Sequence, residues 1–285
     1  MGLSVGDWLR EATKSLLTAG VNEPRLDAEL LLSRHLDLTR AALLAHPDRL
    51  LSSAEAETLA VLLARRATRE PLPYILGVRE FFGLCFAVDP RVLIPRPETE
   101  LLVERALWLA SHMSLSGPLR IADVGTGSGC IAVALAVHLS HALIYATDVS
   151  AEALAVAQRN AAMQGVASHI RFLWGDLLSP VPQSVHLIVA NLPYIPAQEW
   201  ETLPPEVGRF EPRSALDGGS DGLDLVRRLL AQAPSYLLSG GALLLEVGAG
   251  QGETVTRLAR AAFPQAKVEL IPDLAGHARV VQVSL

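Results

Sequence analysis

The sequence has few cysteines and no long apolar run. Its 285 residues include only Cys85 and Cys130, which lie far apart in the chain, so we expect free thiols in a reducing cytoplasm. No stretch approaches the about 18 uncharged apolar residues that a membrane-spanning helix needs. Charged side chains interrupt the first twenty residues, whereas a secretory signal has an unbroken apolar segment. These absences predict a cytoplasmic protein without a membrane span.

Basic charge and clustered metal ligands are also scarce. The net charge is −6, and no basic patch of the kind that duplex nucleic-acid binders carry is visible. The eight histidines are scattered, and the pair His138 and His141 has no third ligand beside it. We therefore expect no direct nucleic-acid contact and no metal. Nothing indicates an oligomer, so the default prediction is a monomer.

The N-terminal part of the chain predicts a small all-helical domain, residues 1–75. Apolar residues recur there at helical spacing in four stretches, and Pro71 ends the last of them. A capping serine, Ser52 or Ser53, is expected to begin the longest helix. The domain contains no catalytic constellation. We interpret it as a substrate-docking domain, and a purely structural extension is the alternative.

The helical region is followed by a proline-rich segment and two short apolar runs. Pro71–Gly77 predicts a linker, and residues 80–88 and 92–94, separated by a turn at 89–91, predict a β-hairpin. The linker with its hairpin is placed at residues 76–98. Glu98 or Thr99 is expected to cap a helix over residues 101–112.

The catalytic domain is predicted at residues 99–285, where strands and helices alternate. Strands are expected at 120–124, 143–147, 170–174, 185–190, 242–247, 267–271 and 279–283. Helices of the length that crosses between parallel strands separate most of them. Only residues 272–277 join the last two strands, so these should pair antiparallel. The predicted fold class is α/β, a Rossmann-like methyltransferase sheet, mostly parallel with the last strand antiparallel.

A glycine-rich loop follows the first strand of this sheet. It runs Gly125-Thr126-Gly127-Ser128-Gly129, and glycines there let the backbone approach a ligand closely. Asp148 ends the second strand, where a carboxylate can accept both hydroxyls of a ribose. NAD and S-adenosylmethionine both carry such a ribose. The loop and Asp148 are therefore compatible with either cofactor.

Asp176 and Leu177 end the third strand, where a methyltransferase would hold the adenine. Asp176 could take the exocyclic amine and Leu177 could contact the ring, although a turn cap also explains Asp176.

The tetrapeptide Asn191-Leu192-Pro193-Tyr194 follows the fourth strand. It distinguishes an NAD-dependent dehydrogenase from an S-adenosylmethionine-dependent methyltransferase. A dehydrogenase needs a proton-transfer residue near the hydride, and no such pair occupies this position. The Asn191 side-chain oxygen and the Leu192 carbonyl could instead grip the two N–H groups of a planar amide or amine. Pro193 would fix the turn and Tyr194 would pack against the planar group. All four are predicted catalytic and substrate-binding residues, and Asn191 should also contact the donor.

Asn-Leu-Pro-Tyr resembles the Asn-Pro-Pro-Tyr motif of methyltransferases that act on planar nitrogens, with Leu192 in place of the first proline. The wider chain resembles the PrmC/HemK family of protein-(glutamine-N5) methyltransferases. The matching segments are Pro71–Gly77, Ile94–Glu100, Asp123–Cys130, Asn191–Ile195, Glu211–Arg213 with Ala215–Gly219, and Asp273–Gly276.

The resemblance implies S-adenosyl-L-methionine as cofactor and class I peptide chain release factors as protein substrate. The methyl group would go to the side-chain N5 of the glutamine in their Gly-Gly-Gln motif, which supports translation termination. The resemblance also implies that the helical domain helps to dock that protein. Three alternatives are weighed against it: an adenine-N6 DNA methyltransferase, which would need a basic groove, a non-catalytic scaffold protein, and a nicotinamide oxidoreductase.

Overall fold

The computed structural model describes residues 2–113 and 117–285, which form two compact units. One unit contains the chain up to Gly77 together with Pro204–Phe210, and the other contains Val78–Leu203 and Glu211–Leu285. The chain therefore passes between the units at three points. Within the residues that the structure describes, no helix is long and apolar enough to cross a membrane.

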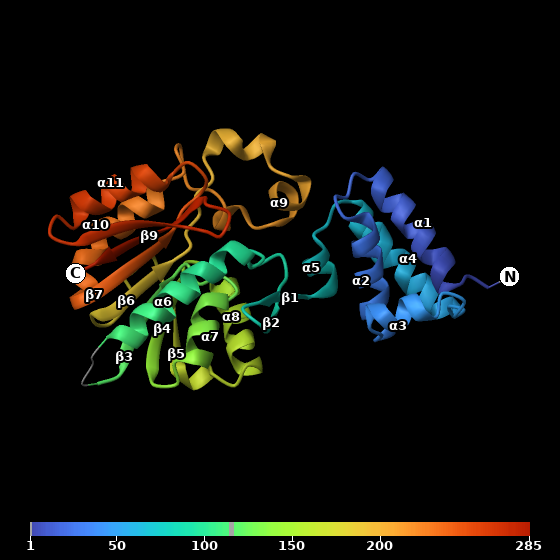
Figure 1. Ribbon diagram of the computed structural model, residues 1–285, viewed down its shortest axis with the longest axis horizontal. Helices are drawn as coiled ribbons and strands as arrows, with labels where there is room; N and C mark the ends of the chain where they lie inside the picture. The colour runs from blue at the N-terminus through green and yellow to red at the C-terminus, as the bar shows by residue number, and fades with distance from the viewer. Residues whose placement is uncertain (1, 114–116) are drawn as a thin grey trace. The chain divides into compact units, whose positions relative to one another are not determined.

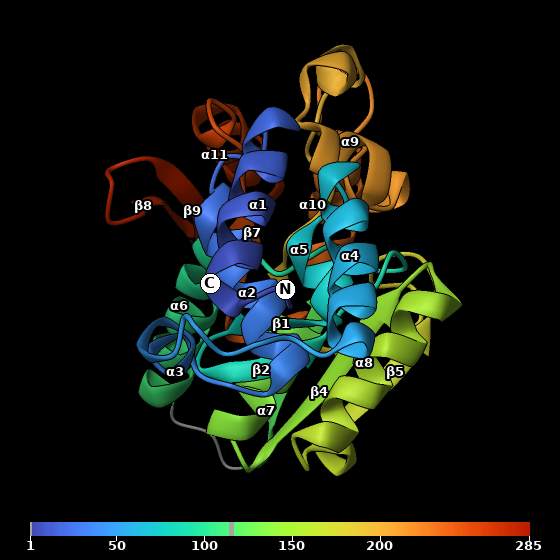
Figure 2. The ribbon, with the colours of Figure 1, turned by 90° about the vertical axis from the view of Figure 1, so that its right-hand side faces the viewer.

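The first unit consists of helices whose apolar faces share one core. Its helices are α1 (Val5–Thr18), α2 (Pro24–Leu36), α3 (Arg40–Ala45), α4 (Ser53–Ala67), α5 (Leu72–Leu76) and α9 (Pro205–Phe210). Helices α1, α2 and α4 lie side by side (Figure 2), and Trp8, Leu31 and Leu59 from these three helices are buried in the core. Ser52 is the cap of α4, in a reciprocal pair of hydrogen bonds with Glu55.

The predicted linker at Pro71–Gly77 is wrong for most of its length, because Leu72–Leu76 form helix α5. Pro73 stands in the first turn of this helix, where no backbone N–H is needed and the fixed φ of proline suits the helix. Tyr74 and Ile75 are buried. The prolines therefore begin a helix here instead of separating two.

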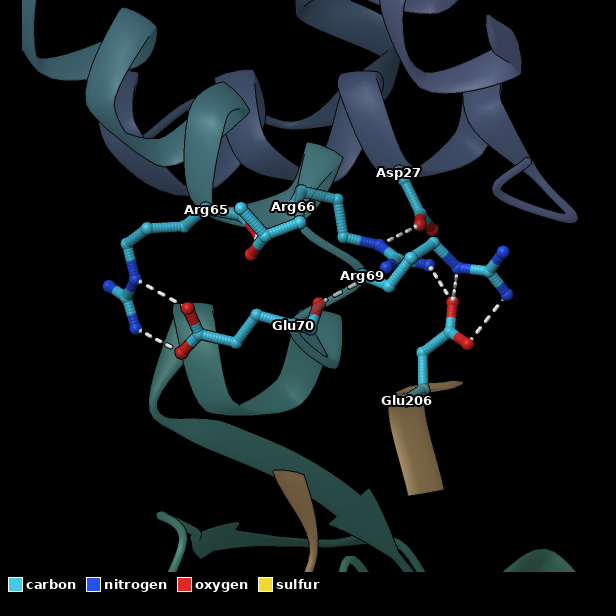
Figure 3. Close-up of polar contacts among 7 residues, drawn as sticks. Asp27, Arg65, Arg66, Arg69, Glu70 and Glu206 are labelled. Carbon is cyan, nitrogen blue, oxygen red and sulfur yellow. Dashed lines mark hydrogen bonds and ion pairs between the residues drawn. The ribbon is translucent and has the colours of Figure 1, made fainter. Parts of the chain in front are cut away.

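Helix α9 belongs to the helical unit although it lies about 140 residues along the chain from the helix that it contacts. Figure 3 shows its Glu206 beside two arginines of the α4 end. The Arg69 guanidinium binds both Glu206 carboxylate oxygens at 2.6 Å. Arg66 donates to Glu206 at 3.0 Å and to Asp27 at 2.7 Å, with only 6% of its surface exposed. These charge-assisted bonds fix a helix that is too short to be stable alone.

We expect Glu206→Gln to loosen α9. Burial raises the pKa of Glu206, but the Arg69 and Arg66 guanidiniums outweigh it and hold that pKa below its ordinary value, so the carboxylate is the form that binds. The loss should be about 2 kcal/mol of unfolding free energy, with faster hydrogen exchange in α9. Glu201→Gln, at an exposed position without an ion pair among the described residues, is the control and should change stability by less than about 0.5 kcal/mol. Equal exchange in both variants would contradict this role of Glu206.

The second unit begins with a β-hairpin whose turn differs from the predicted one. Strands β1 (Val78–Phe81) and β2 (Leu84–Ala87) pair antiparallel, with Phe81 opposite Leu84. The two turn residues, Phe82 and Gly83, have φ values of 51° and 70°, as two-residue hairpin turns require. Residues 89–91 do form a turn, in which the Val92 N–H donates to the Asp89 carbonyl at 3.1 Å, but residues 92–94 form no strand, so this turn joins no hairpin.

Within residues 78–113 and 117–285, seven strands form one sheet in the order β5-β4-β3-β6-β7-β9-β8. Their bounds are β3 (Leu119–Val124), β4 (Ala142–Asp148), β5 (Ile170–Trp174), β6 (Val185–Ala190), β7 (Leu237–Glu246), β8 (Lys267–Pro272) and β9 (Ala278–Ser284). The first five strands in this order pair parallel, and β9 pairs antiparallel with both neighbours. The predicted sheet, with its last strand antiparallel, is confirmed. That strand lies between β7 and β8.

Helices cover both faces of the sheet (Figure 1). The helices of this unit are α6 (Glu100–His112), α7 (Cys130–His138), α8 (Ala151–Met163), α10 (Asp224–Tyr236) and α11 (Gly252–Ala262). Neighbouring residues of β3 face opposite ways, so Ile121 packs in the core beneath α6 and α7 while Ala122 packs in the core beneath α10 and α11. Both faces are apolar, which explains why the strands read as continuous apolar runs. Polar groups collect at the strand ends.

Candidate active site

The candidate site lies at the carboxyl edge of the sheet, where the strand order reverses. Strands β4 and β5 lie on one side of β3, and β6 and β7 lie on the other. Val124, at the end of β3, pairs with Thr147 of β4 and with Ala190 of β6. The residues that follow these strands therefore meet at the topological switch point, where open α/β sheets bind their ligands.

The loop after β3 holds its three glycines in the left-handed region. The φ values of Gly125, Gly127 and Gly129 are 74°, 55° and 80°. Glycine adopts these angles without the strain that a Cβ would add. A Cβ on Gly129 would also lie 2.9 Å from the Cβ of Ala157, so the glycine lets α7 begin directly against α8.

Asp148, the last residue of β4, joins its strand to this loop. Its Oδ2 accepts the Gly127 N–H at 2.9 Å, and its Oδ1 accepts the Ser150 N–H at 2.9 Å. Burial raises the pKa of Asp148, and these two N–H bonds oppose the shift. Each carboxylate oxygen has two acceptor sites, so each keeps one for a ligand. This geometry suits the two hydroxyls of a ribose.

A cavity of about 740 Å³, partly open to solvent, runs along this edge. Eight predicted site residues line it: Gly125, Gly127, Asp148, Asp176, Leu177, Asn191, Leu192 and Pro193. The apolar side chains of Val149 and Leu225 complete the wall near Asp148. Asp176 forms an ion pair with Arg228. The combination of an apolar wall with a carboxylate suits a nucleoside.

A second cavity, of about 350 Å³, adjoins the first. Both are lined by Leu93, Gly125, Gly127 and Asn191, and the second extends to Thr99, Thr126, Ser128 and Cys130. The predicted residues Gly129 and Tyr194 are in the wall of neither cavity. Asn191 therefore lies where the two cavities meet.

The tetrapeptide presents two acceptors at this junction. The Nδ2 of Asn191 donates to the Thr99 hydroxyl at 3.0 Å. No donor among residues 2–113 and 117–285 bonds to the Asn191 Oδ1 or to the Leu192 carbonyl. The Leu192 side chain is buried, and its Cδ2 would lie 3.2 Å from a Cβ on Gly125. Leucine at this position thus packs the tetrapeptide against the glycine loop.

The backbone of Tyr194 is held in place by Gln251. Its carbonyl accepts the Gln251 Nε2 at 2.9 Å, and the Oε1 of Gln251 accepts the Gly248 N–H at 3.0 Å. A Cβ on Gly222 would lie 2.2 Å from the same carbonyl, so only glycine fits there. Burial raises the pKa of the Tyr194 phenol, and the nearby Glu246 adds to the shift. The phenol is therefore neutral at physiological pH.

Other segments on which the family resemblance rests hold the loop around Asn191 in place. Glu211 accepts the Ile94 N–H at 3.2 Å and forms an ion pair with Arg96. After the tetrapeptide, Ile195 exchanges backbone bonds of 2.9 and 3.0 Å with residues 216 and 218. These segments, distant in sequence, fold around Asn191.

Sequence reasoning missed two buried residues beside Asn191. Thr99, predicted only as a helix cap, makes no side-chain cap bond, and its hydroxyl lies instead between Asn191 and Glu246. Glu246 ends β7 with 3% of its surface exposed. A carboxylate at the end of an otherwise apolar strand was the signal that could have found it.

Comparison with known proteins agrees with this fold. Residues 7–77 match the family described as PrmC N-terminal domain, and residues 104–203 match the family described as Methyltransferase small domain. The solved hMettl16 catalytic domain superposes with a TM-score of 0.58 over 78% of this chain and 81% of its own, at 18% identity. At that identity the likeness concerns the fold alone.

Together, the sheet and the site at its switch point define an S-adenosylmethionine-dependent methyltransferase. The release factor glutamine methyltransferase of Geobacter sulfurreducens is 48% identical over 250 residues, which cover 87% of this chain and 84% of the relative. The protein of the same name from Moorella thermoacetica is 46% identical over 272 residues, 95% of each chain. The chain belongs to the release factor glutamine methyltransferase family.

Proposed function

We propose that this enzyme methylates the side-chain N5 of the glutamine in the Gly-Gly-Gln motif of class I release factors, with S-adenosyl-L-methionine as donor. One observation carries the proposal. Asn191 uses its Nδ2 on Thr99, so its oxygen remains to accept an N–H beside the Leu192 carbonyl. Two acceptors at one edge match the two N–H groups of a primary amide. The relatives named for this activity supply the identity of the substrate.

The residues present fit the donor. Asp148 keeps two acceptor sites for the ribose hydroxyls, and Leu177 and Leu225 supply apolar wall for the adenine. Asp176 keeps one oxygen outside its ion pair for the exocyclic amine. When bound, the donor supplies a methyl group on a sulfonium, which is already a strong electrophile. The protein then needs chiefly to position the acceptor nitrogen.

Asn191 and Leu192 hold the acceptor amide by both hydrogens, which turns its nitrogen toward the methyl group. As the new N–C bond forms and the sulfonium C–S bond breaks, positive charge grows on the nitrogen. The two acceptor oxygens stabilise that charge in place, because they do not have to reorganise. One of the held hydrogens then leaves as a proton to water. Pro193 keeps the backbone turn rigid, and Tyr194, whose carbonyl accepts the Gln251 Nε2, anchors the end of the tetrapeptide.

The organisation of the chain follows from this function. We assign residues 1–75 to substrate docking, 76–98 to a linker with the hairpin, and 99–285 to catalysis. The enzyme would act in the cytoplasm, where translation terminates, as a monomer that contacts protein and not nucleic acid.

A transfer assay tests the proposal. Purified release factors carrying either Gly-Gly-Gln or Gly-Gly-Glu are incubated with isotopically labelled donor, and tryptic peptides are sequenced by mass spectrometry. We expect one labelled methyl group on the glutamine and none in the Glu variant. A DNA duplex serves as the second substrate. Label on adenine, or on another residue of the release factor, would contradict the assignment.

A further inference from the structure

Asn191 acts through an oxygen whose direction has to be fixed. A side-chain amide can rotate to exchange its oxygen and its NH₂ group, and only one orientation presents an acceptor. Thr99 Oγ1 lies 3.0 Å from Asn191 Nδ2. The pairing of Ala190 with Leu245 places the next residues, Asn191 and Glu246, side by side at the ends of β6 and β7, and the Thr99 hydroxyl lowers the pKa of the Glu246 carboxyl. Thr99 and Glu246 are both buried, at 2% and 3% exposure. The three side chains thus form one row from the substrate side into the protein.

We propose that Thr99 and Glu246 are positioning residues that fix the Asn191 amide with its oxygen toward the substrate. The inference rests on the proposed function and adds to it two buried residues that act through Asn191. An ionised carboxylate can only accept, so Glu246 takes the single hydroxyl hydrogen of Thr99. Thr99 can then only accept from Asn191. The NH₂ group must face Thr99, and Oδ1 must face away.

The placement of both residues argues against a role in stability alone. Thr99 occupies the cap position of α6, yet its hydroxyl caps no backbone N–H. Glu246 has no ion pair among the described residues, and its second oxygen, Oε2, has no hydrogen-bond partner there. A buried carboxylate with so few partners lowers the stability of the fold. Its presence is explained if it holds Thr99.

The row should respond to pH through Glu246. Burial raises the pKa of Glu246 to about 7 despite the Thr99 hydrogen bond. The charged and titratable groups around it are Arg279 of β9, Arg96 and Glu98 before α6, Tyr194 after β6, and Cys130 of α7. Once protonated, Glu246 can donate to Thr99, and the hydroxyl hydrogen becomes free to turn toward Asn191. The orientation of the amide is then no longer fixed.

A measurement on the protein without substrate tests the row independently of the proposed function. The ¹⁵N side-chain resonance of Asn191, identified by its loss in Asn191→Ala, is followed from pH 5.5 to 8.5. We expect a shift with a midpoint near pH 7 that disappears in Thr99→Val and in Glu246→Gln. Glu253→Gln, at an exposed site on α11, should leave it unchanged. A titration that persists in both test variants would overturn the proposal.

Transfer kinetics give the second test. Thr99→Val should lower kcat about 10- to 100-fold with little change in the Kd of the donor, and Thr99→Ser should restore it to within about threefold. A serine variant as slow as the valine variant would overturn the role of the hydroxyl. If wild-type enzyme leaves the release-factor glutamine unmodified, the proposed function fails, while the resonance titration still decides the inference.

Glu246→Gln separates positioning from structure. The wild-type kcat should fall below about pH 7, and this acid limb should be absent in the variant, whose rate at pH 8 should drop about 10-fold. Its melting temperature at pH 8 should equal or exceed that of wild type, because a buried charge is removed. A lower melting temperature together with an unchanged pH profile would mean that Glu246 serves the fold only.

Discussion

Asn191→Ala is expected to lower kcat for methyl transfer by about 10²- to 10³-fold. The variant loses one of two acceptors that stabilise positive charge on the nitrogen, and loss of one such preorganised group has this magnitude in other enzymes. The backbone should hold, because Asn191 is only partly buried and its one side-chain hydrogen bond among the described residues is to Thr99. Single-turnover measurements with labelled donor give the rate.

The same variant should bind the donor within about threefold of wild type, since Asp148 and the glycine loop are unchanged. Gln265→Ala removes an exposed amide from the same unit and is the matched control, with no expected change in rate. A near-normal rate in Asn191→Ala would show that the amide nitrogen is held by other groups. A large loss of donor affinity would place Asn191 in donor binding instead.

Asp148→Asn should weaken donor binding about 10- to 100-fold. The carboxylate now accepts two backbone N–H bonds and keeps one acceptor site on each oxygen for the ligand. An amide offers one oxygen, and its NH₂ group would face the N–H of Gly127 or Ser150. Hydrogen bonds to a charged group contribute about 1.5–3 kcal/mol, which corresponds to the expected range.

Calorimetric titration with the donor measures this loss directly. Glu152→Gln removes a carboxylate that is exposed at the start of α8, four residues from Asp148, and should leave the affinity unchanged. This control separates the hydrogen bonds of Asp148 from the general effect of one negative charge. Equal losses in both variants would remove Asp148 from the binding site.

The sequence predicts the sheet well where a strand is buried on both faces. The predicted bounds of β6 agree with the structure, because five of its six residues are apolar and the strand is almost wholly buried. The predicted bounds of β5, an edge strand, also agree. The hairpin failed because its turn contains Phe82, an aromatic residue that usually indicates a strand. Helix α5 was not predicted, because its prolines were taken to interrupt a helix, whereas they stand where a helix begins.

The sequence predicted those residues of the candidate site that lie directly at the end of a strand. Asp148 ends β4, and Gly125 and Asn191 directly follow β3 and β6, which pair parallel with one another, so their meeting follows from topology. The roles of Thr99 and Glu246 depend on contacts between residues 147 positions apart, and no local pattern reports such contacts. Thr99 before a helix reads as a cap, and only its hydrogen bonds show otherwise.

The inclusion of α9 in the helical unit bears on how such a protein can be divided. A gene fragment that ends at Gly77 would lack Glu206 and leave the guanidiniums of Arg66 and Arg69 without that carboxylate. A fragment that begins at Val78 would carry α9 without the arginines that hold it. Neither unit can be excised or grafted as one continuous piece. The helical unit and the loop that follows Asn191 are therefore expected to vary together when such enzymes are recombined.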